Sequence, residues 1–126
     1  MMDVILVGLG GSLGAMARYV LSRFVQEQAG PAFPYGTLTV NLIGCLIIGM
    51  LSQLADARNV FTPQSRAFVF AGILGGFTTF SSFANETMVL ARADQHLLAV
   101  LNVALHVVLG LGAVWLGRAM TSLIVK

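Results

Sequence analysis

The chain has 126 residues, of which 57% are hydrophobic and only 10% are charged, with a mean hydropathy of +0.88. A soluble domain usually carries about a quarter charged residues, so this composition excludes a soluble globular enzyme and indicates a protein solvated largely by lipid. The net charge of +2 is too small and too scattered for nucleic-acid binding, and the single cysteine, Cys45, allows no disulfide within the chain. The length suits one domain, residues 1–126.

Four apolar runs divide the chain, each close to the roughly 20 residues that a bilayer-spanning helix needs. They are Val4 to about Val25, Thr37 to Ala55, Ala67 to Ala91, and Leu97 to Gly117. The pattern predicts an all-α protein with four transmembrane helices per subunit, multi-pass in the cell inner (plasma) membrane. No catalytic triad, carboxylate pair or metal cluster stands out, so we do not expect an enzyme.

The first run contains two glycines four residues apart, Gly10 and Gly14, and this spacing lets two helices approach closely. Gly72 and Gly76 repeat the spacing in the third run. We therefore predict packing faces here rather than a nucleotide-binding loop. Arg18 lies inside the first run, either as an interfacial charge that reaches the headgroups or as a charge facing an internal vestibule. Its position alone does not separate the two interpretations.

Polar residues in the second and fourth runs also lie at helical spacing. Thr37 and Asn41 are four apart in the second run, as are Asn102 and His106 in the fourth, so each pair shares a helix face. An amide inside a membrane helix more often bonds a neighbouring helix than lines a pore. For Asn41 both interpretations stay open.

The third run has the least helix-like centre. Gly75 and Gly76 are adjacent and are poor helix formers. The residues that follow include four hydroxyls able to bond the local backbone: Thr78, Thr79, Ser81 and Ser82. A helix broken at membrane depth is tolerated only where it is buried in protein or lines a polar cavity. We therefore predict that the third helix is broken at its centre and that the break is the functional centre of an ion-conducting protein.

Aromatic residues accompany the break. Phe77, Phe80 and Phe83 recur every third residue, and the edge of a phenyl ring carries partial positive charge that can meet an anion. Glu86 is the one acidic residue well inside an apolar run, which makes it a functional candidate by default. It equally suits a helix end near the interface, and its role stays unassigned.

The cations flanking the runs give almost no orientation signal. Four spans place both termini and the 56–65 loop on one side, with four cations: Arg58, Arg66, Arg118 and Lys126. The other side has three: Arg18, Arg23 and Arg92. Because charge bias sets the orientation of membrane helices, we expect a chain that inserts both ways and pairs as an antiparallel homodimer. The two broken helices would then meet, and carbonyls freed at Gly75 and Thr78 of both copies would form a four-oxygen cage for Na⁺.

Three segments with specific motifs lie in three of the four runs. They read Gly-Gly-Ser-Leu-Gly-Ala-Met-Ala-Arg-Tyr at 10–19, Pro-Tyr-Gly-Thr-Leu-Thr-Val-Asn-Leu-Ile-Gly at 34–44, and Gly-Gly-Phe-Thr-Thr-Phe-Ser-Ser-Phe-Ala-Asn-Glu at 75–86. In these segments, in their order and in its length, the chain resembles the small fluoride channels called Fluc, or CrcB. The Gly-Gly-Phe-Thr-Thr-Phe-Ser-Ser-Phe run together with Thr-Val-Asn is the specific part of the resemblance.

The resemblance implies an antiparallel dual-topology homodimer with two pores. Such a dimer exports fluoride passively from the cytoplasm and excludes chloride. By motif, Phe80 and Phe83 would meet fluoride with their ring edges, while Asn41 would donate its amide and Ser81 its hydroxyl. The pore residues that it implies are therefore Asn41, Phe80, Phe83, Ser81, Thr39 in the Thr-Val-Asn segment, and His106. His106 is assigned there because family members often carry hydroxyl residues along the pore on the fourth helix.

The resemblance also implies a central structural ion and a charged vestibule. The carbonyls of Gly75 and Thr78 would hold a Na⁺ ion, and Arg18 would be the buried vestibule arginine. The expected partners are fluoride, a second copy of the chain and the lipid bilayer, with no nucleic acid.

Two other functions compete with this interpretation. A small dual-topology exporter of organic cations has similar length, but it needs a membrane carboxylate to trade the cation against a proton. Only Glu86 is available, and it does not lie in the first helix, where such exporters carry theirs. A non-catalytic assembly subunit would explain the glycines and leave the Phe/Thr/Ser run unexplained.

Overall fold

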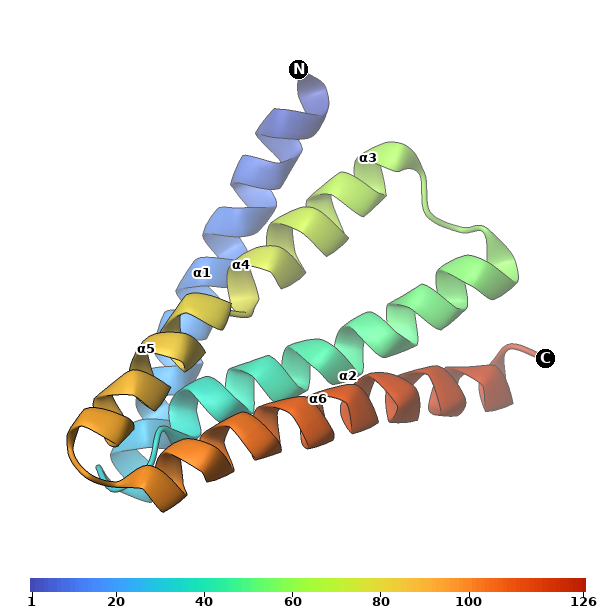
Figure 1. Ribbon diagram of the computed structural model, residues 1–126. Coiled ribbons are helices and arrows are strands. Elements are labelled where there is room, and N and C mark those ends of the chain that lie inside the picture. Colours follow the sequence, from blue (N-terminus) through green and yellow to red (C-terminus); the bar gives the residue numbers. More distant parts are fainter.

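The computed structural model describes residues 1–126 and contains helices without any strand (Figure 1). Four helical stretches are long and apolar enough to cross a membrane: Met2–Ala29, Tyr35–Arg58, Pro63–Arg92 and His96–Ile124. The first, second and fourth are the single helices α1 (Met2–Ala29), α2 (Tyr35–Arg58) and α6 (His96–Ile124). The prediction of an all-α protein with four membrane-spanning helices is confirmed, and each helix extends past its apolar run.

The third stretch is built from several pieces. It begins as α3 (Pro63–Arg66), capped by the Thr62 hydroxyl, and continues as the π-helical η1 (Ala67–Leu74) and the short α4 (Gly75–Phe77). Two residues then leave the helical conformation, with φ and ψ of −93° and 157° at Thr78 and −148° and 110° at Thr79. Helix α5 (Phe80–Arg92) follows. The predicted break in the third helix is therefore present.

The break lies at the hydroxyl residues of the predicted stretch, just after its glycine pair. Gly75 is helical, with φ −62° and ψ −38°, and Gly76 lies within α4. Gly76 serves packing, because a Cβ atom there would overlap the carbonyl oxygen of Gly11 in α1. The chain breaks where the backbone N–H and carbonyl of Thr79 find their partner in the side chain of Asn41 instead of in the helical ladder.

Two pairs of helices diverge like the arms of a V (Figure 1). Helix α1 packs along η1 and α4 in one arm, α2 packs along α6 in the other, and α5 joins α6 near the vertex. In the first arm, Gly10 and Gly14 lie where a Cβ would overlap the carbonyl oxygens of Phe68 and Ile73. The packing role predicted for these glycines is confirmed.

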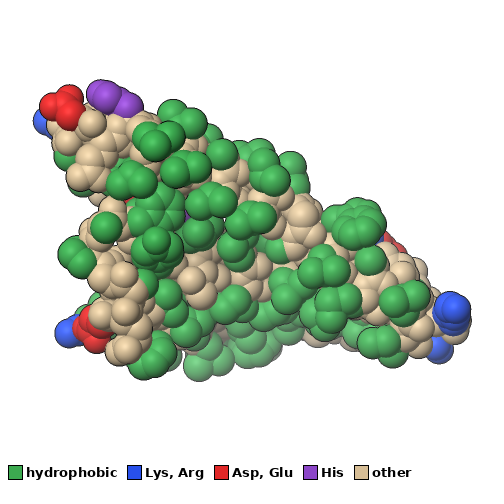
Figure 2. Space-filling view, turned by 90° about the horizontal axis from the view of Figure 1, so that it is seen from below, with side chains coloured by type: hydrophobic (Ala, Val, Ile, Leu, Met, Phe, Trp, Pro, Cys, Tyr) green, Lys and Arg blue, Asp and Glu red, His purple; other side chains and the backbone are tan.

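Hydrophobic side chains spread over the middle of the face shown in Figure 2. Only 18 of 126 residues are buried within one chain, and large side chains such as those of Trp115 and Val108 face outward. In the view of Figure 2, charged side chains gather at the tips of the molecule. This distribution suits helices that cross the hydrocarbon layer and keep their charges at the membrane surfaces.

Candidate functional site

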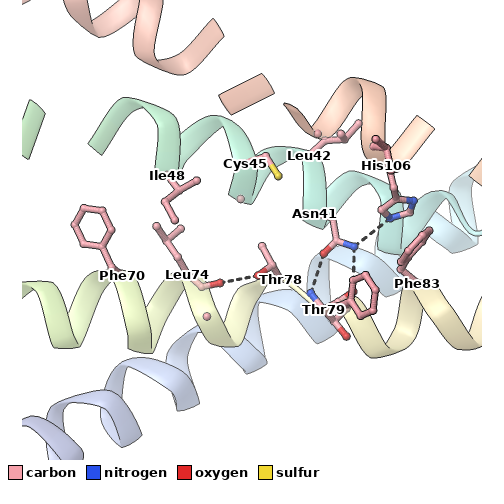
Figure 3. A pocket seen from close by; sticks show the side chains of 15 residues that line it. Asn41, Leu42, Cys45, Ile48, Phe70, Leu74, Thr78, Thr79, Phe83 and His106 are labelled. Atoms are coloured by element: carbon pink, nitrogen blue, oxygen red, sulfur yellow. Dashed lines mark hydrogen bonds between the residues drawn. The ribbon is translucent and has the colours of Figure 1, made fainter. Parts of the chain in front are cut away.

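A cavity of about 410 Å³ lies beside the break (Figure 3). Its walls come from both arms of the V and from α5, and no lysine, arginine, aspartate or glutamate lines it. One end is apolar, where Ile48, Phe70 and Leu74 face one another, and the other carries Asn41 and His106. The remaining lining residues are Leu42, Gly44, Cys45, Gly75, Thr78, Thr79, Phe80, Phe83, Val107 and Gly110.

Asn41 of α2 holds the broken segment by its backbone. Its Oδ1 accepts a hydrogen bond from the Thr79 N–H at 2.8 Å, and its Nδ2 donates to the Thr79 carbonyl at 3.1 Å. A backbone group left without a partner at this depth is costly, so this reciprocal pair of bonds stabilises the extended residue. Thr79 also starts α5, because its hydroxyl accepts from the Ser82 N–H at 3.2 Å.

His106 of α6 completes the polar end. Its Nε2 lies 3.1 Å from Asn41 Nδ2, and its Nδ1 lies 2.9 Å from the carbonyl oxygen of Asn102. Asn102 precedes it by one helical turn, as the sequence spacing predicted. A single amide therefore connects three elements: α2, the break and α6.

Two phenyl rings form the aromatic side of the cavity. The rings of Phe80 and Phe83 meet edge to face, with centroids 5.4 Å apart and planes at 61°. Phe83 also lies against the imidazole of His106, with centroids 4.3 Å apart. Phe80 is 79% exposed within one chain, so its ring stands at the open side of the cavity. Both rings line the cavity that Asn41 also lines, and the edge of a phenyl ring carries partial positive charge.

The break redirects the backbone bonds of Gly75 and Thr78. In an unbroken helix the N–H of Thr79 would donate to the Gly75 carbonyl, but here it donates to Asn41. The Thr78 carbonyl accepts no hydrogen bond, while the Thr78 N–H and hydroxyl both donate to the Leu74 carbonyl at 3.1 Å. The carboxyl end of α4 thus presents carbonyl oxygens whose helical partners are gone.

Arg18 of α1 contacts the same end of the broken helix. Its Nε donates to the Gly76 carbonyl at 3.0 Å. A cation near the carboxyl end of a helix is favourable because it complements the local backbone dipoles. Arg18 does not line the cavity, so this contact stabilises the break from the side of α1.

A second polar layer lies one helical turn away, at Thr37 and Asn102. The Thr37 hydroxyl donates to Glu86 Oε1 at 2.7 Å, and Asn102 Nδ2 donates to the Thr87 hydroxyl at 2.9 Å. Glu86 Oε2 and Asn102 Oδ1 are buried without a hydrogen-bond partner, and no cation pairs with Glu86. This layer continues the polar end of the cavity toward the vertex of the V.

The structure brings together most of the residues singled out in the sequence. The cavity is lined by Asn41, Phe80, Phe83, His106, Gly75 and Thr78. It is not lined by Ser81, Thr39, Arg18 or Glu86, although the Ser81 hydroxyl lies 3.3 Å from that of Thr79. Sequence reasoning missed the backbone of Thr79 as the partner of Asn41. The available signal was a threonine three residues before Ser82, a spacing typical of helix starts.

Comparison with known proteins adds an independent finding. Residues 5–118 match the family described as CrcB-like protein, Camphor Resistance (CrcB). A protein of Parabacteroides distasonis named fluoride-specific ion channel FluC is 46% identical over 117 residues, which cover 93% of this chain and 91% of the relative. Proteins of the same name from Shewanella woodyi and Methylobacillus flagellatus are 43% and 45% identical over 118 residues. These matches cover 94% of both chains for the first, and 93% of this chain and 92% of the relative for the second.

Proposed function

This chain belongs to the CrcB family, and we propose that it is a fluoride-selective ion channel that lets fluoride leave the cytoplasm passively and so confers fluoride resistance. It is a multi-pass membrane protein and a channel rather than an enzyme. The observation that carries the proposal is a cavity lined by an amide, an imidazole and two phenyl rings without any lysine, arginine, aspartate or glutamate.

The donor set suits the chemistry of fluoride. The ion is small and tightly hydrated, so a pathway has to replace its water with several weak donors. Conduction also requires that binding be weak enough for the ion to leave, which a lysine or arginine in the cavity would prevent. The Asn41 amide and the edges of Phe80 and Phe83 are donors of this weak kind.

We also propose that two copies assemble as an antiparallel homodimer around a structural Na⁺. The nearly balanced flanking cations support insertion in both orientations. The residues of the break suit the ion, because unwound backbone carbonyls and the carboxyl ends of half-helices are typical Na⁺ ligands in membrane proteins. The carbonyls of Gly75 and Thr78 have lost their helical partners and would hold it.

Anion efflux from liposomes containing the purified protein tests the channel proposal. Wild-type protein should release fluoride rapidly and chloride negligibly. Phe80→Ile and Phe83→Ile keep apolar bulk but lose the ring edges, so each should reduce fluoride efflux at least about tenfold, the cost of one lost contact of roughly 1.4 kcal/mol in the pathway.

Phe24→Ile is the matched control, because this phenylalanine is exposed on α1 and does not line the cavity. Unchanged fluoride efflux in both cavity variants would refute a role for the rings of Phe80 and Phe83 in the ion pathway. Absence of fluoride release from folded wild-type protein would refute the channel and leave the organic-cation exporter as the alternative.

Labelling from one side of the membrane tests dual topology. In a Cys45→Ala background, Gln95→Cys and Thr62→Cys place a thiol in the connectors at opposite ends of the spans. With both orientations present, a membrane-impermeant maleimide should modify about half of each variant. Complete modification of one and none of the other would establish a single orientation and exclude the antiparallel dimer.

A further inference from the structure

Both N–H donors of the Asn41 amide are engaged in the structure. A side-chain amide offers two N–H donors and one carbonyl oxygen. Nδ2 donates to the Thr79 carbonyl and to His106 Nε2, each at 3.1 Å, and Oδ1 accepts from the Thr79 N–H. Asn41 is the only side-chain amide that lines the cavity. An anion that enters therefore meets this amide only after one of the two donated bonds has been released.

The two donated bonds differ in what their loss would cost. The bond to the Thr79 carbonyl is half of a reciprocal pair that holds an extended residue at membrane depth, so its loss would leave a buried backbone group without a partner. The bond to His106 holds no backbone group. His106 is therefore the partner that the amide can exchange.

The hydrogen bonds of His106 define its tautomer. Its Nδ1 faces the Asn102 carbonyl oxygen, which only accepts, so Nδ1 carries the proton. Its Nε2 faces Asn41 Nδ2, which only donates, so Nε2 presents a lone pair. The imidazole is neutral in this arrangement. Its Nε2 occupies the position of an acceptor at the amide, which is the position that an anion would take.

We propose that His106 is the exchangeable acceptor of the Asn41 amide and that fluoride displaces its Nε2 to reach the N–H, a role that rests on the proposed channel function. The imidazole stays anchored by its Nδ1–H bond to Asn102 and by its contact with Phe83, so only the Nε2 side is released. His106 is thus a specificity-determining residue, because an ion reaches the Asn41 amide only by replacing its Nε2 as the acceptor.

The exchange discriminates between halides. An incoming ion has to be a better acceptor than an imidazole nitrogen, and the electrostatic attraction of an N–H group falls as the distance to the charge grows. Fluoride brings its charge closer to the amide than the larger chloride does. Chloride would therefore leave the Asn41–His106 bond intact and would not bind the N–H group of the amide.

Nitrogen NMR of histidine in lipid bilayers tests the exchange directly. The chain has two histidines, and the exposed His96 can be replaced by glutamine so that the remaining ¹⁵N-histidine signals belong to His106. Before fluoride is added, Nδ1 should appear as a protonated nitrogen and Nε2 as a hydrogen-bonded acceptor. Saturating fluoride should move the Nε2 signal to that of an acceptor without a partner and leave the Nδ1 signal unchanged. Chloride at the same concentration should change neither signal.

A variant measured by flux provides the second test. His106→Leu removes the competing acceptor, so the fluoride concentration for half-maximal flux should fall about fivefold, the equivalent of one net hydrogen bond of roughly 1 kcal/mol. The preference for fluoride over chloride should fall with it. His106→Gln restores an acceptor and should return both quantities toward the wild type.

The outcomes separate this inference from the function on which it rests. An Nε2 signal that ignores fluoride in protein that conducts fluoride would overturn the exchange and leave the channel in place. A half-maximal concentration that is unchanged or higher in His106→Leu would also overturn it. Folded wild-type protein without fluoride flux would overturn the channel function itself.

Discussion

Asn41 connects the elements around the polar end of the cavity through its hydrogen bonds. Its side chain holds the break through Thr79 and reaches His106 on the last helix, so three elements share one amide. A leucine of similar size would leave the N–H and carbonyl of Thr79 without partners, and each unpartnered buried group costs about 1–3 kcal/mol. The structure therefore gives this amide the interhelical role that its position in the sequence allowed, and its contact with the ion belongs to the proposed function.

Glu86 separates the channel from the cation exporter at the level of one residue. It accepts a hydrogen bond from Thr37, its second oxygen is buried without a partner, and no cation pairs with it. Glu86→Gln keeps the acceptor for Thr37 and removes the titrating proton. A channel should then keep its fluoride efflux within about threefold of the wild type, because less than one net hydrogen bond is altered. Loss of all transport would favour the exporter, which needs a carboxylate that exchanges protons.

The broken third helix depends on a glycine in a neighbouring helix. A Cβ atom at Gly44 of α2 would overlap Cγ2 of Thr78, so α2 approaches the break closely only because this side chain is absent. Gly44→Ala should displace Thr78, destabilise the fold by about 1–3 kcal/mol and reduce fluoride efflux about tenfold or more. Thermal unfolding and liposome efflux of the same preparation measure the two effects.

Gly112→Ala, in α6, is the matched control for Gly44→Ala. Nothing lies within 4 Å of a Cβ atom built at Gly112, and alanine favours a helix over glycine by up to about 1 kcal/mol. This variant should be as stable as the wild type or more so, with normal efflux. Equal effects of the two substitutions would show that helix propensity, rather than the approach to Thr78, governs position 44.

The third helix also shows how far the sequence predicts an element. Gly75 and Gly76, with the hydroxyl residues after them, correctly indicated a break within the span. The sequence did not select the residue at which the helix breaks, because a glycine pair lowers helix propensity in the same way whether the chain breaks there or packs there. What separates the two is Gly11 of α1 beside Gly76, and Asn41 beside Thr79. Both contacts join residues distant in the sequence, so local propensity cannot reveal them.

At the scale of the whole molecule, one chain does not enclose the cavity on all sides. The cavity opens between two arms, and Phe80 is largely exposed at its open side. Helix number and approximate span positions followed from apolar length alone, because the bilayer thickness fixes that length. The V shape did not follow from it, since every helix is apolar on most of its surface and hydropathy does not select its neighbours. Only the glycine spacings indicated faces that pack closely.

The proposed Na⁺ is a property of the assembled molecule, since its carbonyls come from two copies. Replacing Na⁺ on both sides of the membrane by a large organic cation for a prolonged period should slow fluoride flux, because the carbonyls of Gly75 and Thr78 would lose their ligand. Restoring Na⁺ should return the flux. Flux that is indifferent to prolonged Na⁺ removal would leave the proposed ion without support.

The pairing of α2 with α6, rather than with α1 or the third stretch, has a consequence for biosynthesis. Helix α2 emerges from the ribosome well before its main partner, because the whole third stretch is made in between. Asn41 can hold Thr79 as soon as α5 exists, but it meets His106 only after the last helix has entered the membrane. The polar end of the cavity is therefore complete only once α6 is in place, and a nascent chain arrested before α6 carries the break without its imidazole.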